Sequence, residues 1–421
     1  MKHYPDYKKL LFSAIVLVAL IIMPSAFLSA QTAREIQEKI DQKDSEIQQL
    51  EKEIAAYQTE LNGLEKQKSS LSKSIKELDL TRKKLNADIA VTQNKIDKTN
   101  LKIKNLSSDI NTKEDSINNN INSIKLQIRS ISEFEEKSLV ETILSDNDFT
   151  ALWNDVDNIV TVREKIRENT IKLQEMKGAL EETRESTIDA KNELTKLKTQ
   201  LSDQQKIVVQ NTAEKNKLLK QTQNNEANYQ KLLRDRMAKK EAFEQELEAY
   251  EAQLQFILDP SKLPSGRVLS WPLDSIYVTS PYAPRWGGFH RGTDFRASIG
   301  TSVKAMADGV VGGTGDTDVC CPGASFGKWI FIEYNNGLSS TYGHLSLITV
   351  RKDQQVKRGQ VVGYSGNSGS STGPHLHVSL YVSSGVQVDS FPSKSYPGKT
   401  LIQPISATNA YLDPMRYLPP L

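Results

Sequence analysis

Apolar residues recur in steps of four and three along two stretches of this chain, and this heptad pattern constrains the fold more than any other feature. The first stretch runs from Ile36 to Ile124 in one register. The second runs from Ile159 to Tyr250 and ends before Pro260, because proline stops a helix. Each stretch predicts a long amphipathic helix whose apolar seam must pack against another helix.

The heptad pattern fails over residues 132–158, which favours a tip or hinge where the chain turns back. Polar seam residues such as Lys68, Arg82 and Lys113 suit a coiled coil that fixes its register at some cost in stability. Two helices of this length would form an antiparallel hairpin of roughly 140 Å at 1.5 Å per residue. A parallel dimer of the whole rod is the alternative, but it needs no break at its midpoint. The prediction is an antiparallel coiled-coil hairpin over residues 31–258.

Residues 1–30 have the layout of a secretory signal, with lysines, an apolar run from Leu10 to Ile22, and Ala30 before the expected cut. Leu28 is larger than the small residue usual at its position, so an uncleaved membrane anchor is the alternative. No cysteine lies in this segment, which excludes a lipoprotein anchor. We therefore expect export to the periplasm or the extracellular cell-wall space, with attachment to the membrane if the signal stays uncleaved.

Charge and cysteine content say little about partners. The formal net charge of +2 gives no argument for nucleic acid or for an anionic membrane surface. The two cysteines are the neighbours Cys320 and Cys321, whose Cα atoms must lie about 3.8 Å apart, so a disulfide between them would be strained. Exposed thiols are expected, with a bridge to another chain as the alternative.

Beyond a short linker at residues 259–267, the pattern changes to short β-like runs separated by glycine and asparagine turn signals. These runs are residues 276–279, 302–306, 309–312, 329–334, 339–343, 360–364 and 377–382. Residues 268–421 are long enough for one independent core. The sequence therefore predicts an all-β antiparallel domain that follows the helices.

Four of the five histidines lie in this domain, in the motifs His290-Arg-Gly-Thr-Asp294, Tyr-Gly-His344 and His375-Leu-His377. A catalytic zinc ion usually has three imidazole or carboxylate ligands and one open position for water. Residues two apart on a strand point to the same face, so His375 and His377 should enter one pocket. The histidine set predicts a hydrolytic centre with one zinc ion per chain. There is no His-Glu-x-x-His motif, so a glutamate base is not expected.

Three segments of the domain resemble the M23 (LytM/lysostaphin-like) peptidoglycan endopeptidases: Ser280–Trp286, His290–Asp294 and Gly366–His377. The order of signal, coiled coil and domain also resembles the EnvC-like septal murein hydrolase factors. The fold that these resemblances imply is a long α-helical coiled-coil hairpin followed by an all-β, antiparallel-sheet M23-type metallopeptidase domain.

The resemblance implies that His290, Asp294 and His377 are the zinc ligands. It implies that His344 and His375 are catalytic residues beside the metal, and it leaves open which of the two is the base. Four residues are expected to line the substrate cleft, or alternatively to be core or strand-edge residues: Tyr282, Arg285, Trp286 and Tyr342. Relatives often carry glutamate or glutamine where this chain has Ser379, which puts a local polar contact in doubt.

The function implied is a secreted zinc metalloendopeptidase that hydrolyses peptide cross-links of bacterial peptidoglycan, in cell-wall remodelling or daughter-cell separation. The coiled coil would bind a membrane division complex of the ABC-transporter type. The alternative is a non-catalytic LytM-type activator of a cell-wall amidase; EnvC-like proteins of that kind typically lack metal ligands, whereas this chain keeps them. A purely structural coiled-coil spacer would leave the histidines unexplained. We also expect that the helical rod could hold the domain shut until a partner pulls on it.

Overall fold

The computed structural model describes residues 25–65, 69–135, 149–254, 256–259, 261, 263–285 and 288–421. Contacts divide the chain into two units, each made of separated segments: residues 1–49 with 91–200, and residues 50–90 with 201–421. The expected signal lies almost wholly outside the described residues. None of the helices in the described ranges is long and apolar enough to cross a membrane.

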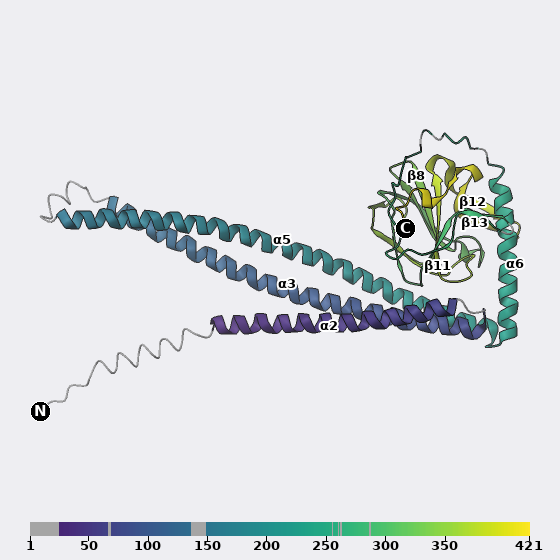
Figure 1. Ribbon diagram of the computed structural model, residues 1–421, viewed down its shortest axis with the longest axis horizontal. Helices are drawn as coiled ribbons and strands as arrows, with labels where there is room; N and C mark the ends of the chain where they lie inside the picture. The colour runs from purple at the N-terminus through teal and green to yellow at the C-terminus, as the bar shows by residue number, and fades with distance from the viewer. Residues whose placement is uncertain are drawn as a thin grey trace, which may run out of the picture. The chain divides into compact units, whose positions relative to one another are not determined.

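Four long helices precede the sheet in the described part of the chain: α2 (Ser25–Glu65), α3 (Leu71–Glu135), α5 (Phe149–Thr222) and α6 (Glu226–Glu251) (Figure 1). The expectation of one unbroken helix from 36 to 124 is therefore wrong, because α2 ends before α3 begins. Residues 136–148 of the predicted tip at 132–158 lie outside the described ranges, and the flanks on both sides are helical. A heptad register can read across a turn, so the sequence pattern did not reveal the first break.

In the first unit, α3 and α5 are antiparallel. Glu114 pairs with Arg184 at 2.9 Å, whereas Asn120, further along α3, donates to the backbone oxygen of Asn169, which lies earlier in α5. The polar seam residue Lys113 is bonded across the pair to a threonine hydroxyl at 2.6 Å. These contacts confirm the antiparallel hairpin, with α2 as an additional helix that the prediction had merged with α3.

The expected second helix, from 159 to 250, is also broken. Gln223 and Asn224 have φ values of 50° and 53°, in the left-handed region that ends a right-handed helix. Asn225 then caps α6, and its side-chain oxygen accepts hydrogen bonds from two backbone N–H groups of the first turn at 2.8 and 3.2 Å. The turn gives α6 a direction different from that of α5 (Figure 1).

The C-terminal domain is an antiparallel β structure built on a ten-stranded sheet, whose main path has the order β1-β4-β11-β8-β7-β6-β9. Its strands are β1 (Val278–Ser280), β4 (Thr293–Arg296), β5 (Ser302–Lys304), β6 (Gly309–Asp316), β7 (Lys328–Tyr334), β8 (Leu338–Ile348), β9 (Gln355–Val356), β10 (Val361–Ser365), β11 (His375–Val382) and β14 (Tyr411–Leu412). Two further ribbons are β2 (Ala283–Arg285) with β3 (Gly288–His290), and β12 (Val386–Ser393) with β13 (Lys399–Ser406). The all-β antiparallel prediction is confirmed.

The main core packs against this sheet and contains Phe295, Ile330, Leu376 and Tyr342. Tyr342 is fully buried, and its hydroxyl accepts a hydrogen bond from the backbone N–H of Met306 at 3.0 Å. The expectation that Tyr342 lines the substrate cleft is therefore wrong. Its side chain points to the core face of β8, because alternate residues of a strand face opposite sides of the sheet.

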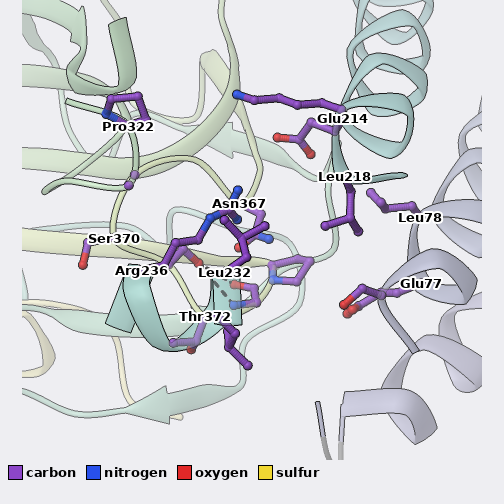
Figure 2. A pocket seen from close by; sticks show the side chains of 18 of the residues that line it. Glu77, Leu78, Glu214, Leu218, Leu232, Arg236, Pro322, Asn367, Ser370 and Thr372 are labelled. Carbon is purple, nitrogen blue, oxygen red and sulfur yellow. Dashed lines mark hydrogen bonds between the residues drawn. The ribbon is translucent and has the colours of Figure 1, made fainter. Parts of the chain in front are cut away.

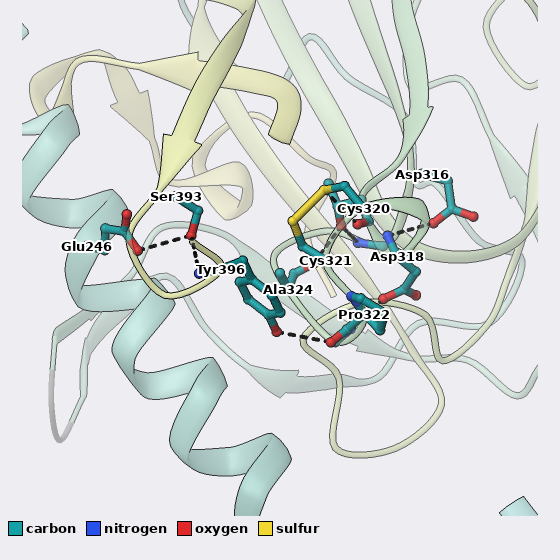
Figure 3. The surroundings of a disulfide bond; sticks show 12 residues. Glu246, Asp316, Asp318, Cys320, Cys321, Pro322, Ala324, Ser393 and Tyr396 are labelled. Atoms are coloured by element: carbon teal, nitrogen blue, oxygen red, sulfur yellow. Dashed lines mark hydrogen bonds between the residues drawn. A yellow bond between two sulfur atoms is a disulfide. The ribbon is translucent and has the colours of Figure 1, made fainter. Parts of the chain in front are cut away.

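The expectation of exposed thiols is also wrong, because Cys320 and Cys321 are joined by a disulfide (Figure 3). Cys321 is fully buried, in a small apolar cluster that contains Phe243 of α6 and Phe391 of β12. Asp318 holds the loop by accepting a hydrogen bond from the backbone N–H of Gly323 at 2.6 Å. The loop is thus part of a packed element and not a free surface turn.

Candidate metal centre

Three side chains converge beside the paired strands β4 and β11. His290 ends β3, Asp294 lies in β4, and His377 lies directly opposite Asp294 in the paired strand β11. The Asp294 Oδ1 atom is 2.8 Å from His377 Nδ1 and 3.3 Å from His290 Nε2. These three residues each offer one ligand atom, all within 4.8 Å of one another. Two imidazole nitrogens and one carboxylate oxygen are a donor set that suits zinc.

The outer nitrogen of each imidazole in this set is fixed by a neighbour. His290 Nδ1 lies 2.8 Å from the carbonyl oxygen of Pro281, which can only accept, so Nδ1 carries the hydrogen and Nε2 presents its lone pair to the cluster. His377 Nε2 lies 2.8 Å from the hydroxyl of Ser379. Ser379 therefore makes an outer contact at the position where the sequence departs from the family pattern, and such contacts orient a metal ligand.

The protonation states also suit a metal. Burial by itself would raise the pKa of Asp294, but the interactions with the adjacent His290 and His377 rings outweigh it and hold the pKa well below its usual range. Burial lowers the pKa of His377. An ionised carboxylate and a neutral imidazole are the forms that bind a metal ion, so the residues present fit zinc.

Gly292 allows the backbone to pass against the metal cluster. A Cβ atom at this position would overlap the ring of His377 and would lie 2.8 Å from the carbonyl oxygen of Val378. Any larger residue would push β11 or the His377 ring away from Asp294. The glycine of the His290–Asp294 motif is therefore required by packing.

His344 and His375 lie beside the three clustered residues, with their ring centroids 4.7 Å apart. His344 Nδ1 donates to the carbonyl oxygen of Ser368 and His375 Nδ1 donates to that of Gly373, each at 2.8 Å. Both rings therefore keep an Nε2 lone pair free, and His375 Nε2 is 3.6 Å from Asp294 Oδ1. As predicted from their spacing, His375 and His377 enter one cavity.

His344 has an unusual backbone conformation for its position inside β8, with φ of 59°. A non-glycine residue in this region costs free energy and is often found at functional sites. Burial, followed by the nearby His375 and His377, lowers the pKa of His344 well below its usual value. The ring is therefore a neutral proton acceptor at pH 7.

The cleft around these residues has a volume of about 350 Å³. Arg285 lines it, as expected from the sequence, and so does Arg291, which sequence reasoning missed although it lies inside the metal motif. Tyr282 does not line this cleft; its ring packs against Phe289 of β3, with the two centroids 4.8 Å apart. Trp286, the remaining expected cleft residue, lies outside the described residues.

A second cavity, of about 270 Å³, lies elsewhere in the same unit (Figure 2). Glu214 of α5, Arg236 of α6 and Asn367 of the sheet domain line it, and none of its described lining residues is a histidine. The four clustered histidines therefore all line the first cavity.

Comparison with known proteins agrees with this geometry. Residues 288–390, which hold all four clustered histidines, match the model of peptidase family M23. The C-terminal domain is an M23 peptidase domain. The M23 model begins at β3 and ends in β12, so it includes both strands that carry the proposed metal ligands opposite each other.

The relatives of the M23 domain include peptidoglycan endopeptidases. Peptidoglycan DD-endopeptidase ShyA of Vibrio cholerae is 44% identical over 105 residues, which are 25% of this chain and 22% of ShyA. Glycyl-glycine endopeptidase ALE-1 of Staphylococcus capitis is 40% identical over 92 residues, which are 22% of this chain and 24% of ALE-1. A crystal structure of a zinc-containing peptidase from Vibrio cholerae aligns with 33% identity and a TM-score of 0.25, over 28% of this chain and 38% of that chain. The chain thus spans about a quarter of the length of these two curated relatives.

Proposed function

We propose that this protein is an exported zinc metalloendopeptidase that hydrolyses peptide cross-links of bacterial peptidoglycan, in cell-wall remodelling or daughter-cell separation. The observation that carries the proposal is the complete His290, Asp294 and His377 set with two further imidazoles beside it. The M23 relatives with peptidoglycan endopeptidase activity support the substrate class. The helical region would bind a membrane division complex.

The roles of the chain's own residues follow from the geometry. His290, Asp294 and His377 would hold one zinc ion, which, when bound, lowers the pKa of a coordinated water and polarises the scissile carbonyl. His344 is neutral and buried, with Nε2 free to take a proton. His375 also keeps Nε2 free, and in its protonated form it would stabilise developing negative charge or serve the leaving amine.

The test is hydrolysis of purified peptidoglycan by the full chain and by His290→Ala, each with and without a zinc chelator. Released fragments are identified by mass spectrometry, and zinc content is measured for both proteins. We expect the wild-type chain to cleave peptide cross-links and the chelator to abolish this cleavage. His290→Ala should cleave none. Since the cleft is covered in this structure, the same assay includes the Glu244→Gln/Glu248→Gln variant described below.

The second candidate, a non-catalytic activator of a cell-wall amidase, makes the opposite prediction. It would be favoured if zinc-loaded full chain and the double glutamine variant both left peptide cross-links intact. The complete metal-binding set argues against this candidate, because an activator has no need of it.

A further inference from the structure

Helix α6 covers the metal cleft. The cleft is lined on one side by the histidines and Asp294, and on the other by Lys240, Phe243, Glu244, Leu247, Glu248 and Glu251 of α6. The helix and the sheet domain belong to the same unit of the chain. One side of the cleft is therefore formed by a helix of the same chain, and the contacts of that helix indicate what the cleft can bind.

Two carboxylates of α6 pair with the two arginines of the cleft. Glu244 is 3.0 Å from Arg285, and Glu248 is 2.9 Å from Arg291. Residues four apart lie on one face of a helix, so both carboxylates point into the cleft together. Arg291 directly follows His290, so its carboxylate partner sits next to the proposed metal site.

Stability alone is a weak reason for these pairs. The side chains of Arg285 and Glu244 are each 41% exposed, and ion pairs at such exposure contribute about 0–1 kcal/mol. Arg291 is different, because its side chain is only 18% exposed and its guanidinium lies 5.7 Å from the centre of the Tyr411 ring. A cation held in place this way, beside a metal cleft, requires an anionic partner to offset its desolvation.

Other contacts hold α6 outside the metal cleft. Phe243 is 1% exposed and packs against the disulfide loop and against Phe391. Glu246 accepts hydrogen bonds from the hydroxyl of Ser395 at 2.7 Å and from that of Ser393 at 3.2 Å (Figure 3). The helix therefore packs against the disulfide loop and the β12–β13 ribbon independently of the cleft. The ion pairs of Glu244 and Glu248 inside the cleft are additional contacts.

We propose that Arg285 and Arg291 form a paired site for carboxylates of the peptide substrate, and that Glu244 and Glu248 occupy this site while α6 is docked. A guanidinium presents N–H donors in a planar fork that matches a carboxylate, which is why arginine suits this task. Stem peptides of peptidoglycan carry free carboxylates. This inference rests on the proposed function, since it names the feature by which that cleft recognises its substrate and the chain segment that competes with it.

The experiment compares four proteins, each as the full chain: wild type, Glu244→Gln/Glu248→Gln, Arg285→Gln/Arg291→Gln, and the control Glu241→Gln. Glu241 is exposed on the same helix and does not line the cleft. Hydrogen exchange over residues 241–251 reports docking of α6. Calorimetry with a synthetic stem peptide that carries two free carboxylates, and with its doubly amidated form, reports recognition without any cleavage step.

We expect the glutamate double variant to exchange faster at α6 and to bind the dicarboxylate peptide at least tenfold more tightly than wild type. The arginine double variant should also exchange faster, yet gain no affinity, and Glu241→Gln should match wild type. Equal binding of the free and amidated peptides, or equal affinity in both double variants, would overturn the proposal. If the expected binding pattern is observed but no protein cleaves peptidoglycan, the carboxylate site is supported and the endopeptidase proposal fails. If peptidoglycan is cleaved without this binding pattern, the endopeptidase proposal is supported and the carboxylate site fails.

Discussion

Gly292 is the residue whose missing side chain decides most directly whether the metal cluster forms. It lies between two of the proposed ligands in sequence, and its Cα faces the ring of the third. The site depends in the same way on Ser379, whose hydroxyl fixes the outer nitrogen of His377. Both residues act on ligand geometry without offering a ligand atom of their own.

Replacement of Gly292 by alanine is expected to displace His377 and to reduce zinc affinity by at least tenfold, because the new methyl group would overlap its ring. The measurement is zinc affinity by competition with a chromophoric chelator. Gly373→Ala is the control glycine replacement, since a Cβ at Gly373 meets no atom within 4 Å. Wild-type affinity in Gly292→Ala would contradict the close packing described here.

Ser379→Ala should lower zinc affinity by about 10–100-fold, the range typical when the outer partner of a metal-bound imidazole is lost. The fold should persist, because one small buried hydroxyl is removed from the centre of a strand. The same competition assay, with circular dichroism for the fold, checks this result. Ser390→Ala, at an exposed position of β12, is the control and should leave affinity unchanged.

At the scale of elements, α6 is a helix with both a structural and a chemical role. Phe243 packs against the disulfide loop and the β12–β13 ribbon, while Glu244, Glu248 and Glu251 line the metal cleft. Glu251, in its last turn, is 2% exposed and bonds the hydroxyl of Tyr411 at 2.7 Å. Burial raises the pKa of Glu251 to about 7, partly offset by this hydrogen bond and by Arg291.

The raised pKa of Glu251 predicts that docking of α6 weakens as pH rises. The docked helix keeps its proton up to pH about 7, whereas the exposed carboxyl loses it near 4.5, so the folded state binds more protons between these values. The contribution is complete below pH 4.5 and is lost on passing pH 7, and at about 1.4 kcal/mol per pKa unit it is about 3 kcal/mol. Hydrogen exchange of residues 241–251 from pH 5 to 8 measures it. Glu251→Gln should exchange with a markedly weaker pH dependence; an unchanged pH dependence would assign the effect to another group.

At the scale of the whole molecule, the chain consists of two units that each combine distant segments, and α2, α3 and α5 contribute residues to both. In the second unit, the short turn between α5 and α6 places a cleft-facing helix directly after a long one. The left-handed Gln223 and Asn224 and the cap at Asn225 make this turn. The direction of α6 relative to the end of α5 therefore depends on this turn.

The double replacement Gln223→Ala/Asn224→Ala should favour continuation of α5 into α6, because alanine is the best helix former and is strained in the left-handed region. A continuous helix cannot keep the present direction of α6, so the docked form is disfavoured by the helix propensity that alanine adds, up to about 0.7 kcal/mol per residue. Hydrogen exchange at residues 241–251 should therefore become several-fold faster. Gln223→Gly/Asn224→Gly, which relieves the left-handed conformation, is the control and should not loosen α6.

The sequence by itself determined the two kinds of architecture and the residues that converge on the metal site. Heptad spacing is a local property, so it predicted long helices and the antiparallel pairing of α3 with α5. Short β-like runs between glycine and asparagine turn signals predicted the strands. The spacing of His375 and His377 predicted that they share a cavity, because strand geometry has a period of two. The resemblance added the grouping of His290 with Asp294 and His377, which lie 2.8 to 3.3 Å apart in the structure.

Only the tertiary structure decided which surfaces meet across long distances in the chain. The buried position of Tyr342 and the placement of Arg291 opposite Glu248 depend on neighbours remote in sequence. The helix breaks and the disulfide of Cys320 with Cys321 are also visible only in the structure. Most decisive is α6 over the cleft, since an amphipathic helix that could join a coiled coil packs equally well against any complementary apolar surface. Whether α6 packs against another helix or against the sheet domain depends on the free energy of the complete folded unit, which the local heptad pattern does not determine.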